Sequence, residues 1–126
     1  LIDVIVSDHL PEDEESKRLP FVQAATGAIG VETLLPLALE MYHNESLSLN
    51  KIIETLTINP AKILKIKKGT LAKGSDGDIC ILDLEAPWAV QADKLKSKSK
   101  NTAIEGRKLQ GKVLMTFLNG HLAFKQ

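Results

Sequence analysis

The opening segment, residues 1–6, limits what this chain can fold into, because it is short, apolar and rich in β-branched residues. Such a run predicts a strand that is buried on both faces, as in a parallel sheet. No second strand pattern follows it until about residue 78. One strand with helices leaves an unpaired sheet edge and cannot close a core alone. We therefore expect the first half of the chain to be part of a larger α/β domain that begins upstream.

Apolar periodicity predicts the helices. Residues 11–19 have no periodicity and predict an exposed loop. Residues 32–42 carry one broad apolar face, which predicts a helix that tolerates Pro36 only in its first turn. Residues 49–56 form a second amphipathic stripe, and Ser48 is a suitable N-cap for it.

A third helix is expected over residues 61–64, with Asn59 as its cap and Pro60 at the first helical position. From Gly69 onward the chain is rich in turns and strands. Residues 78–84 predict a strand in which Cys80 is a buried small side chain. Asn119-Gly120, between two apolar runs, is a strong hairpin signal. We place a domain boundary near residue 68, between segments 1–68 and 69–126.

The charges exclude several classes of function. Lys plus Arg and Asp plus Glu number 16 each, so the formal net charge is zero and no nucleic-acid-binding surface is indicated. The basic cluster at residues 94–100 predicts a solvated loop, with a contact to a phosphate or an acidic partner as the alternative. No apolar stretch approaches the roughly 20 residues that span a bilayer, and no signal-peptide pattern is present, so we expect no membrane contact and a cytoplasmic protein.

Asp8, at the end of the first predicted strand, is the best candidate for catalysis. In a parallel α/β barrel, catalytic groups follow the C-terminal ends of strands, where a carboxylate can hold a divalent metal and accept a proton. The alternative is an aspartate that caps a turn. His9 is expected to be structural because successive strand side chains point to opposite sides. No histidine pair has metal-ligand spacing, so the chain alone should bind metal poorly.

Gly27 and Gly30 let the backbone approach a ligand closely, and their N–H groups suit a carboxylate or an imide oxygen. The alternative is an ordinary loop before a helix.

Ser7-Asp8-His9-Leu10-Pro11 resembles the Asp-His-Ala-Pro-His motif of dihydroorotases, which are cyclic amidohydrolases. The similarity covers essentially the whole chain. It continues through residues 17–21, 27–37, 59–62, 69–78 and 97–102. The blocks at 27–37 and 97–102 are the more specific to dihydroorotases.

The resemblance implies a metal-dependent (β/α)8 barrel flanked by a β-sandwich. Residues 1–68 would hold the last barrel strand and the helices after it, and residues 69–126 the C-terminal part of the sandwich. The family reaction is the reversible cyclisation of N-carbamoyl-L-aspartate to dihydroorotate in pyrimidine synthesis, with one or two zinc ions. By matched position, Asp8 would ligate one metal, take the proton of the attacking hydroxide and pass it to the leaving nitrogen. The other ligands would lie upstream of this chain.

Two positions concern substrate binding. The family's second motif histidine, four residues after the aspartate, binds the substrate carboxylate, and here that position is Glu12. An anionic glutamate would repel a carboxylate. The family's backbone contacts fall on Thr26 and Gly27, although the residues just before Gly27 depart from the usual pattern.

Three functions follow from the resemblance. The first is a dihydroorotase seen only in part, a homo-oligomer whose isolated fragment is inactive. The second is a related hydrolase such as an allantoinase or a dihydropyrimidinase. The third is a non-catalytic scaffold, for instance for aspartate transcarbamoylase, and Glu12 is its main support.

Overall fold

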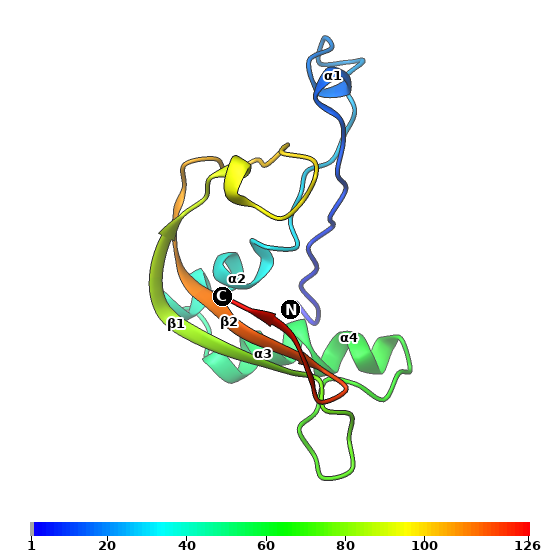
Figure 1. The fold of residues 1–126 in the computed structure, drawn as a ribbon, viewed down its shortest axis with the longest axis vertical. Coiled ribbons are helices and arrows are strands. Elements are labelled where there is room, and N and C mark those ends of the chain that lie inside the picture. The colour runs from blue at the N-terminus through cyan, green and yellow to red at the C-terminus, as the bar shows by residue number, and fades with distance from the viewer. Residues whose placement is uncertain (1) are drawn as a thin grey trace.

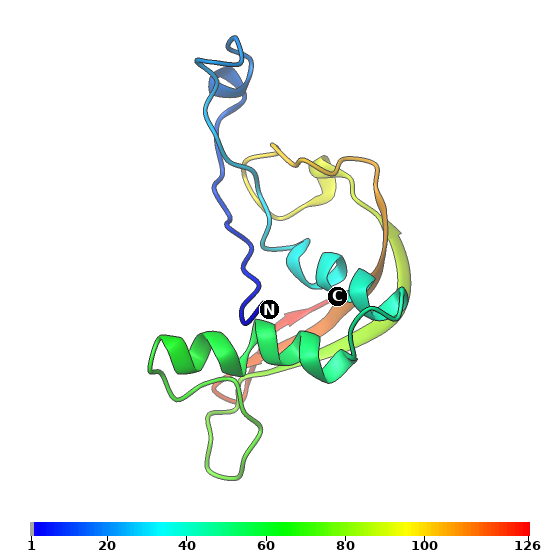
Figure 2. The same ribbon diagram turned by 180° about the vertical axis from the view of Figure 1, so that it is seen from behind.

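The computed structural model describes residues 2–126 as a curved antiparallel sheet, a group of three helices and an arm that extends away from both (Figure 1). The first of the three helices packs on the sheet, the second packs on the first, and the third on the second. The arm carries the short helix α1 near its tip, and the sheet curves around α2 (Figure 2). The elements in chain order are α1 (Glu14–Lys17), α2 (Leu34–His43), α3 (Leu49–Leu56), α4 (Ile58–Ile63), β1 (Ile79–Ala89), the 3-10 helix η1 (Ala92–Lys94), β2 (Lys108–Leu118) and β3 (His121–Lys125).

The predicted first strand is wrong for the part of it that the structure describes. Residues 2–6 run extended but belong to no strand, and Ile2 and Val6 are 65% and 69% exposed. Leu1 lies outside the described residues. The segment is held by single contacts instead, including the Ile5 N–H to the Thr55 carbonyl at 3.1 Å. Because a strand needs a partner along its edge, an apolar run without one forms no ladder and is not buried.

The helix predictions that rest on Ser48 as a cap and on the position of Pro36 are confirmed. Ser48 caps α3, and its hydroxyl accepts the Lys51 N–H at 3.3 Å. Pro36 lies in the first turn of α2, as it must. Residues 14–17 form the short helix α1 where a loop was predicted, because the Asp13 carboxylate accepts the Ser16 N–H and caps the turn.

The Asn59 cap is wrong, since α4 begins at Ile58 and its N-cap is Thr57. The Asn59 side chain instead donates to the Asp3 carbonyl at 2.8 Å. It therefore fixes the extended N-terminal segment to α4.

The hairpin prediction is confirmed. β2 and β3 pair antiparallel, and both turn residues, Asn119 and Gly120, have positive φ values of 49° and 78°. Two successive positive φ values match the twist of the flanking strands. β1 runs further than predicted and pairs antiparallel with β2, with irregularities after Ile81 and Asp83. Cys80 is exposed rather than buried, because this part of β1 has no layer over its outer face.

The close contact between helix and sheet is at Gly111 of β2, whose φ is +103°. A Cβ atom at Gly111 would lie 2.4 Å from Leu39 Cδ1 of α2. Leu39 is fully buried, and the Gly111 carbonyl accepts the Trp88 indole N–H at 3.1 Å. Only glycine fits both the backbone angle and the space here.

The buried core joins segments that lie far apart in the sequence. One cluster of buried apolar side chains contains Ile29, Val90, Leu95 and Leu109. Within residues 2–126, no helix has the length and apolar character needed to cross a membrane.

A salt-bridge cluster holds the 69–77 loop near the hairpin. Lys68 Nζ lies 2.7 Å from Asp76 Oδ2 and 2.5 Å from Asp78 Oδ2. The other oxygen of Asp78 accepts the Asn119 N–H at 2.8 Å. The two carboxylates raise the pKa of Lys68, with Asp76 the larger cause. The Asn119 N–H first, and then Lys68, lower the pKa of Asp78.

Candidate functional site

Asp8 and Gly27 line one pocket of about 530 Å³. The pocket lies between the extended N-terminal segment, the turn at residues 27–30 and α2. Most of its other lining groups are apolar, so a carboxylate and a glycine backbone face a largely apolar space. This composition is typical of a small-molecule site, in which a few polar groups fix the orientation of the ligand.

Asp8 sits at a sharp turn of the backbone. Its φ is +43°, in the left-handed region that only a few non-glycine residues adopt, aspartate among them. Directly after it, His9 pairs with Ala28 in an isolated parallel bridge, and the Leu10 N–H donates to the Ala28 carbonyl at 3.0 Å. The segment after Asp8 therefore runs beside the Gly27 turn, which explains why the two residues share a pocket.

His9 contacts the backbone rather than the pocket. Its Nδ1 lies 3.0 Å from the Gly30 N–H and 3.4 Å from the Val31 N–H. An imidazole nitrogen that accepts is unprotonated, so the ring proton is on Nε2. His9 thus has the structural role that was predicted.

Gly27 has a φ of +116°, and a Cβ atom there would come within 2.7 Å of the Leu10 side chain. Its carbonyl accepts the Lys17 ammonium at 2.9 Å and the Asn101 amide at 3.2 Å. The backbone at Gly27 is therefore held by side chains from two distant segments.

Glu12 and Thr26 are not among the residues that line the Asp8 pocket. The main chain of Glu12 is held by a second loop: its N–H donates to Asn101 Oδ1 at 3.4 Å, and its carbonyl accepts the Ser99 hydroxyl at 2.5 Å. Thr26 is exposed. Of the four predicted site residues, the structure brings two into one pocket and places the other two beside it.

The amidohydrolase family model matches residues 1–123. The chain belongs to the amidohydrolase family. The dihydroorotase of Ehrlichia chaffeensis is 44% identical over 125 residues, which cover 99% of this chain and 28% of that protein. The dihydroorotase of Pelobacter propionicus is 40% identical, over 99% of this chain and 30% of its own length. The amidohydrolase chain thus spans less than a third of these curated relatives.

Solved cyclic amidohydrolases share the fold. The dihydropyrimidinase of Brevibacillus agri has a TM-score of 0.92 at 23% identity, over 98% of this chain and 28% of that one. The L-hydantoinase of Arthrobacter aurescens has a TM-score of 0.76 at 34% identity, over 82% and 24%. The inactive dihydroorotase-like domain of a multifunctional protein from Chaetomium thermophilum has a TM-score of 0.60 at 20% identity, over 75% and 25%.

Potential metal ligands are scattered in the part of the chain that the structure describes. Within residues 2–126, no group of three or more His, Cys, Asp or Glu side chains is placed to hold an ion. Asp8 offers a single carboxylate, whereas a catalytic zinc takes about three protein ligands. The described residues therefore do not make up a complete metal site.

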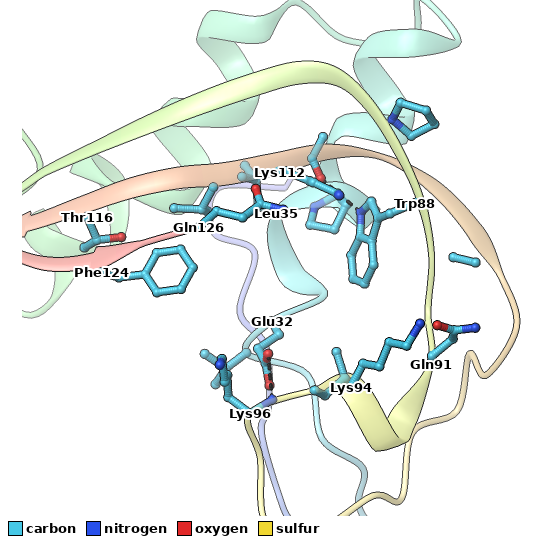
Figure 3. A pocket seen from close by; sticks show the side chains of 17 residues that line it. Glu32, Leu35, Trp88, Gln91, Lys94, Lys96, Lys112, Thr116, Phe124 and Gln126 are labelled. Carbon is cyan, nitrogen blue, oxygen red and sulfur yellow. Dashed lines mark hydrogen bonds between the residues drawn. The ribbon is translucent and has the colours of Figure 1, made fainter.

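A larger pocket, of about 870 Å³, lies between the start of α2, the sheet and the C-terminal end of β3 (Figure 3). Its one carboxylate, Glu32, accepts the N–H groups of Lys96 and Ser97 at 2.9 Å and 3.1 Å. Lys94, Lys96 and Lys112 line it as well. Glu32 is hydrogen-bonded to the backbone of a loop, whereas the Asp8 carboxylate has no hydrogen-bond partner within residues 2–126, so we take the Asp8 pocket as the candidate site.

Sequence reasoning missed Lys17, Glu32 and Asn101 as residues that shape the site. Each lies in a block that resembles dihydroorotases, but no local pattern shows where its side chain points. Their partners lie between 8 and 89 positions away along the chain. Such contacts can be found only once the fold is known.

Proposed function

We propose that the full-length protein is a dihydroorotase, which interconverts N-carbamoyl-L-aspartate and dihydroorotate in pyrimidine synthesis. The observation that carries this proposal is the shared pocket of Asp8 and Gly27, a carboxylate beside a glycine backbone. The 44% identity to the dihydroorotase of Ehrlichia chaffeensis supports it. We also propose that the 126 residues alone are inactive, since Asp8 is the one metal ligand that the resemblance assigns to them.

The proposal includes the architecture of the whole protein. Residues 1–68 would supply the last strand and the following helices of a (β/α)8 barrel, and residues 69–126 the C-terminal part of a flanking β-sandwich. Residues 2–6 are extended and run towards Asp8, as a last barrel strand would once its neighbours are present. The TM-score of 0.92 to a dihydropyrimidinase is consistent with this arrangement.

The proposed chemistry assigns one proton transfer to Asp8. A zinc ion, held mainly by residues outside this chain, would supply a Lewis acid and a water that ionises near neutral pH. The Asp8 carboxylate would accept the proton of the attacking water and deliver it to the ring nitrogen that leaves. Gly27 and Thr26 would bind the substrate through their backbone groups. Glu12 would lie beside the carboxylate of the substrate.

We further propose that the full-length protein is a cytoplasmic homo-oligomer. Aspartate transcarbamoylase is the partner that the resemblance suggests. Copurification of the two proteins, together with a molar-mass measurement, tests both statements.

Glu12 favours a second function, a non-catalytic dihydroorotase-like scaffold. A glutamate stands where the motif has a carboxylate-binding histidine. An inactive dihydroorotase-like domain is among the proteins of similar structure. A third candidate is hydrolysis of a related ring, which the hydantoinase and dihydropyrimidinase structures favour.

The deciding experiment measures zinc-dependent cyclisation of N-carbamoyl-L-aspartate by the full-length protein, with hydantoin and dihydrouracil as competing substrates. Asp8→Asn should lower kcat by roughly a hundredfold or more, as expected for loss of a general base. Asp3→Asn is the matched control, because Asp3 is exposed and is held only through its carbonyl.

Turnover of dihydroorotate that Asp8→Asn does not reduce would refute the role of Asp8. No turnover of any ring by the zinc-loaded wild type would favour the scaffold. Turnover of hydantoin or dihydrouracil alone would favour a related hydrolase.

A further inference from the structure

A loop from the C-terminal half of the chain holds both segments that face the proposed substrate site. This loop, residues 96–101, begins where Glu32 accepts the N–H groups of Lys96 and Ser97. Figure 3 shows Glu32 beside Lys96. Glu32 lies two residues before Leu34, the first residue of α2. The loop is therefore fixed to the segment that joins the Gly27 turn to α2. At its other end, Asn101 contacts Gly27 and Ile29, which line the same pocket as Asp8.

Asn101 makes the contacts at that end. Its side-chain Nδ2 donates to the Gly27 carbonyl at 3.2 Å, and its Oδ1 accepts the Glu12 N–H at 3.4 Å. Its backbone carbonyl accepts the Ile29 N–H at 3.1 Å. One half-buried side chain therefore joins the segment after Asp8 to the Gly27 turn.

These contacts fix the carbonyl of Gly27 and, with it, the peptide group that joins Gly27 to Ala28. A carbonyl oxygen has two lone pairs, and at Gly27 these meet Lys17 Nζ and Asn101 Nδ2. The Gly27 N–H belongs to the preceding peptide group, between Thr26 and Gly27, and has no hydrogen-bond partner within residues 2–126. Because Gly27 lines the pocket, a ligand bound there would lie beside this turn of the backbone.

We infer that Asn101 is a positioning residue for substrate binding: it holds Gly27 and the Glu12 segment so that the backbone of the Gly27 turn receives the acidic, ring-forming substrate. This inference rests on the proposed function for the identity of the substrate. It assigns Asn101 no contact with the reacting atoms.

The chemistry of the amide makes the inference specific. Asn101 acts as donor and acceptor at once, and no other side chain of its shape does both. Asn101→Asp keeps the shape but replaces the donor by an anionic oxygen that faces the Gly27 carbonyl. This isosteric change removes the hydrogen bond without creating a cavity.

The test compares Asn101→Asp with Asn50→Asp in the zinc-loaded full-length protein. Asn50 is an exposed residue of α3 with no side-chain hydrogen bond within residues 2–126, which makes it the matched control. We expect the KM for dihydroorotate to rise about tenfold in Asn101→Asp, with kcat changed less than about twofold. The rise reflects the loss of one hydrogen bond between neutral groups and the repulsion between the new carboxylate and the Gly27 carbonyl. Amide hydrogen exchange should become faster at residues 8–12 and 25–30 only.

Lys17→Met is the second variant, because it removes the other donor to Gly27 and should change KM in the same direction. Unchanged KM and unchanged exchange in Asn101→Asp would overturn the inference. A fall in both kcat and melting temperature, with KM unaltered, would also overturn it. If the wild type turns over another ring, the same comparison is made with that ring. If it turns over none, the proposed function fails, and the exchange rates still decide whether Asn101 holds the two segments.

Discussion

The imidazole Nδ1 of His9 accepts a hydrogen bond from the N–H of Gly30 at 3.0 Å. The backbone at Gly30 also passes close to Ser7, so that a Cβ atom there would lie 2.5 Å from the Ser7 carbonyl oxygen. These two contacts flank Asp8. The backbone on both sides of Asp8 is therefore packed against the turn before α2.

Replacing His9 should test this packing. His9→Leu leaves the Gly30 N–H without its acceptor and should lower the free energy of unfolding of the full-length protein by about 1 kcal/mol. His9→Asn keeps a side-chain acceptor and should recover part of the loss. Denaturant unfolding measures both, with the exposed His121→Leu of β3 as the control. An equal loss in His9→Leu and His9→Asn would show that the acceptor is not what matters.

Gly111→Ala should be among the most destabilising small substitutions in the chain. The new methyl group meets Leu39 Cδ1, and the positive φ adds strain, so we expect a loss of about 2–4 kcal/mol of unfolding free energy. Gly106→Ala is the matched control, because Gly106 also has a positive φ but no atom within 4 Å of an added Cβ. Thermal unfolding of both variants separates the clash from the strain, and equal losses would exclude the clash.

The sequence predicts the elements that depend on neighbouring residues. Ser48 and the apolar stripe after it define α3, and Asn119-Gly120 defines the hairpin, because cap and turn geometry involve only a few adjacent positions. Residues 2–6 were misjudged for the opposite reason. Their composition suits a buried strand, but the strands and helices that would bury it are not within residues 2–126.

The same distinction between local and distant contacts applies to the residues of the candidate site. Asp8 and Gly27 could be proposed from the sequence because each belongs to a short local motif, and the structure places both in one pocket, although residues 2–6 before Asp8 form no strand. Asn101 was not found, since its importance comes from contacts 74 and 89 positions away in the sequence. No periodicity or spacing records such a contact.

The cluster of Lys68 and Asp78 should give the unfolding free energy a defined pH dependence. Asp78 has a lowered pKa, so its stabilisation is complete above the unfolded value of about 3.9 and is lost as pH falls through the lower folded value. Lys68 has a raised pKa, so its share is complete below about 10.4 and is lost as pH rises through the folded value.

The measurement is the difference in unfolding free energy between wild type and Asp78→Asn across this range. The difference should be constant near neutral pH and shrink at both extremes. Asp93→Asn on η1, where no salt bridge is present within the described residues, should show neither change. A difference that grows towards acid pH would contradict the assignment.

Glu12 offers the sharpest test of substrate recognition. Its contacts with Asn101 and Ser99 use only the main chain, so a new side chain at position 12 should leave both segments in place. If Glu12 lies beside the substrate carboxylate, Glu12→Gln removes a repulsion and should lower the KM for dihydroorotate by roughly fivefold. Glu12→His should lower it further, because a protonated imidazole attracts the carboxylate. Steady-state kinetics decides, with the exposed Glu54→His of α3 as the control. An unchanged KM in both variants would place Glu12 away from the substrate and remove the main argument for a non-catalytic scaffold.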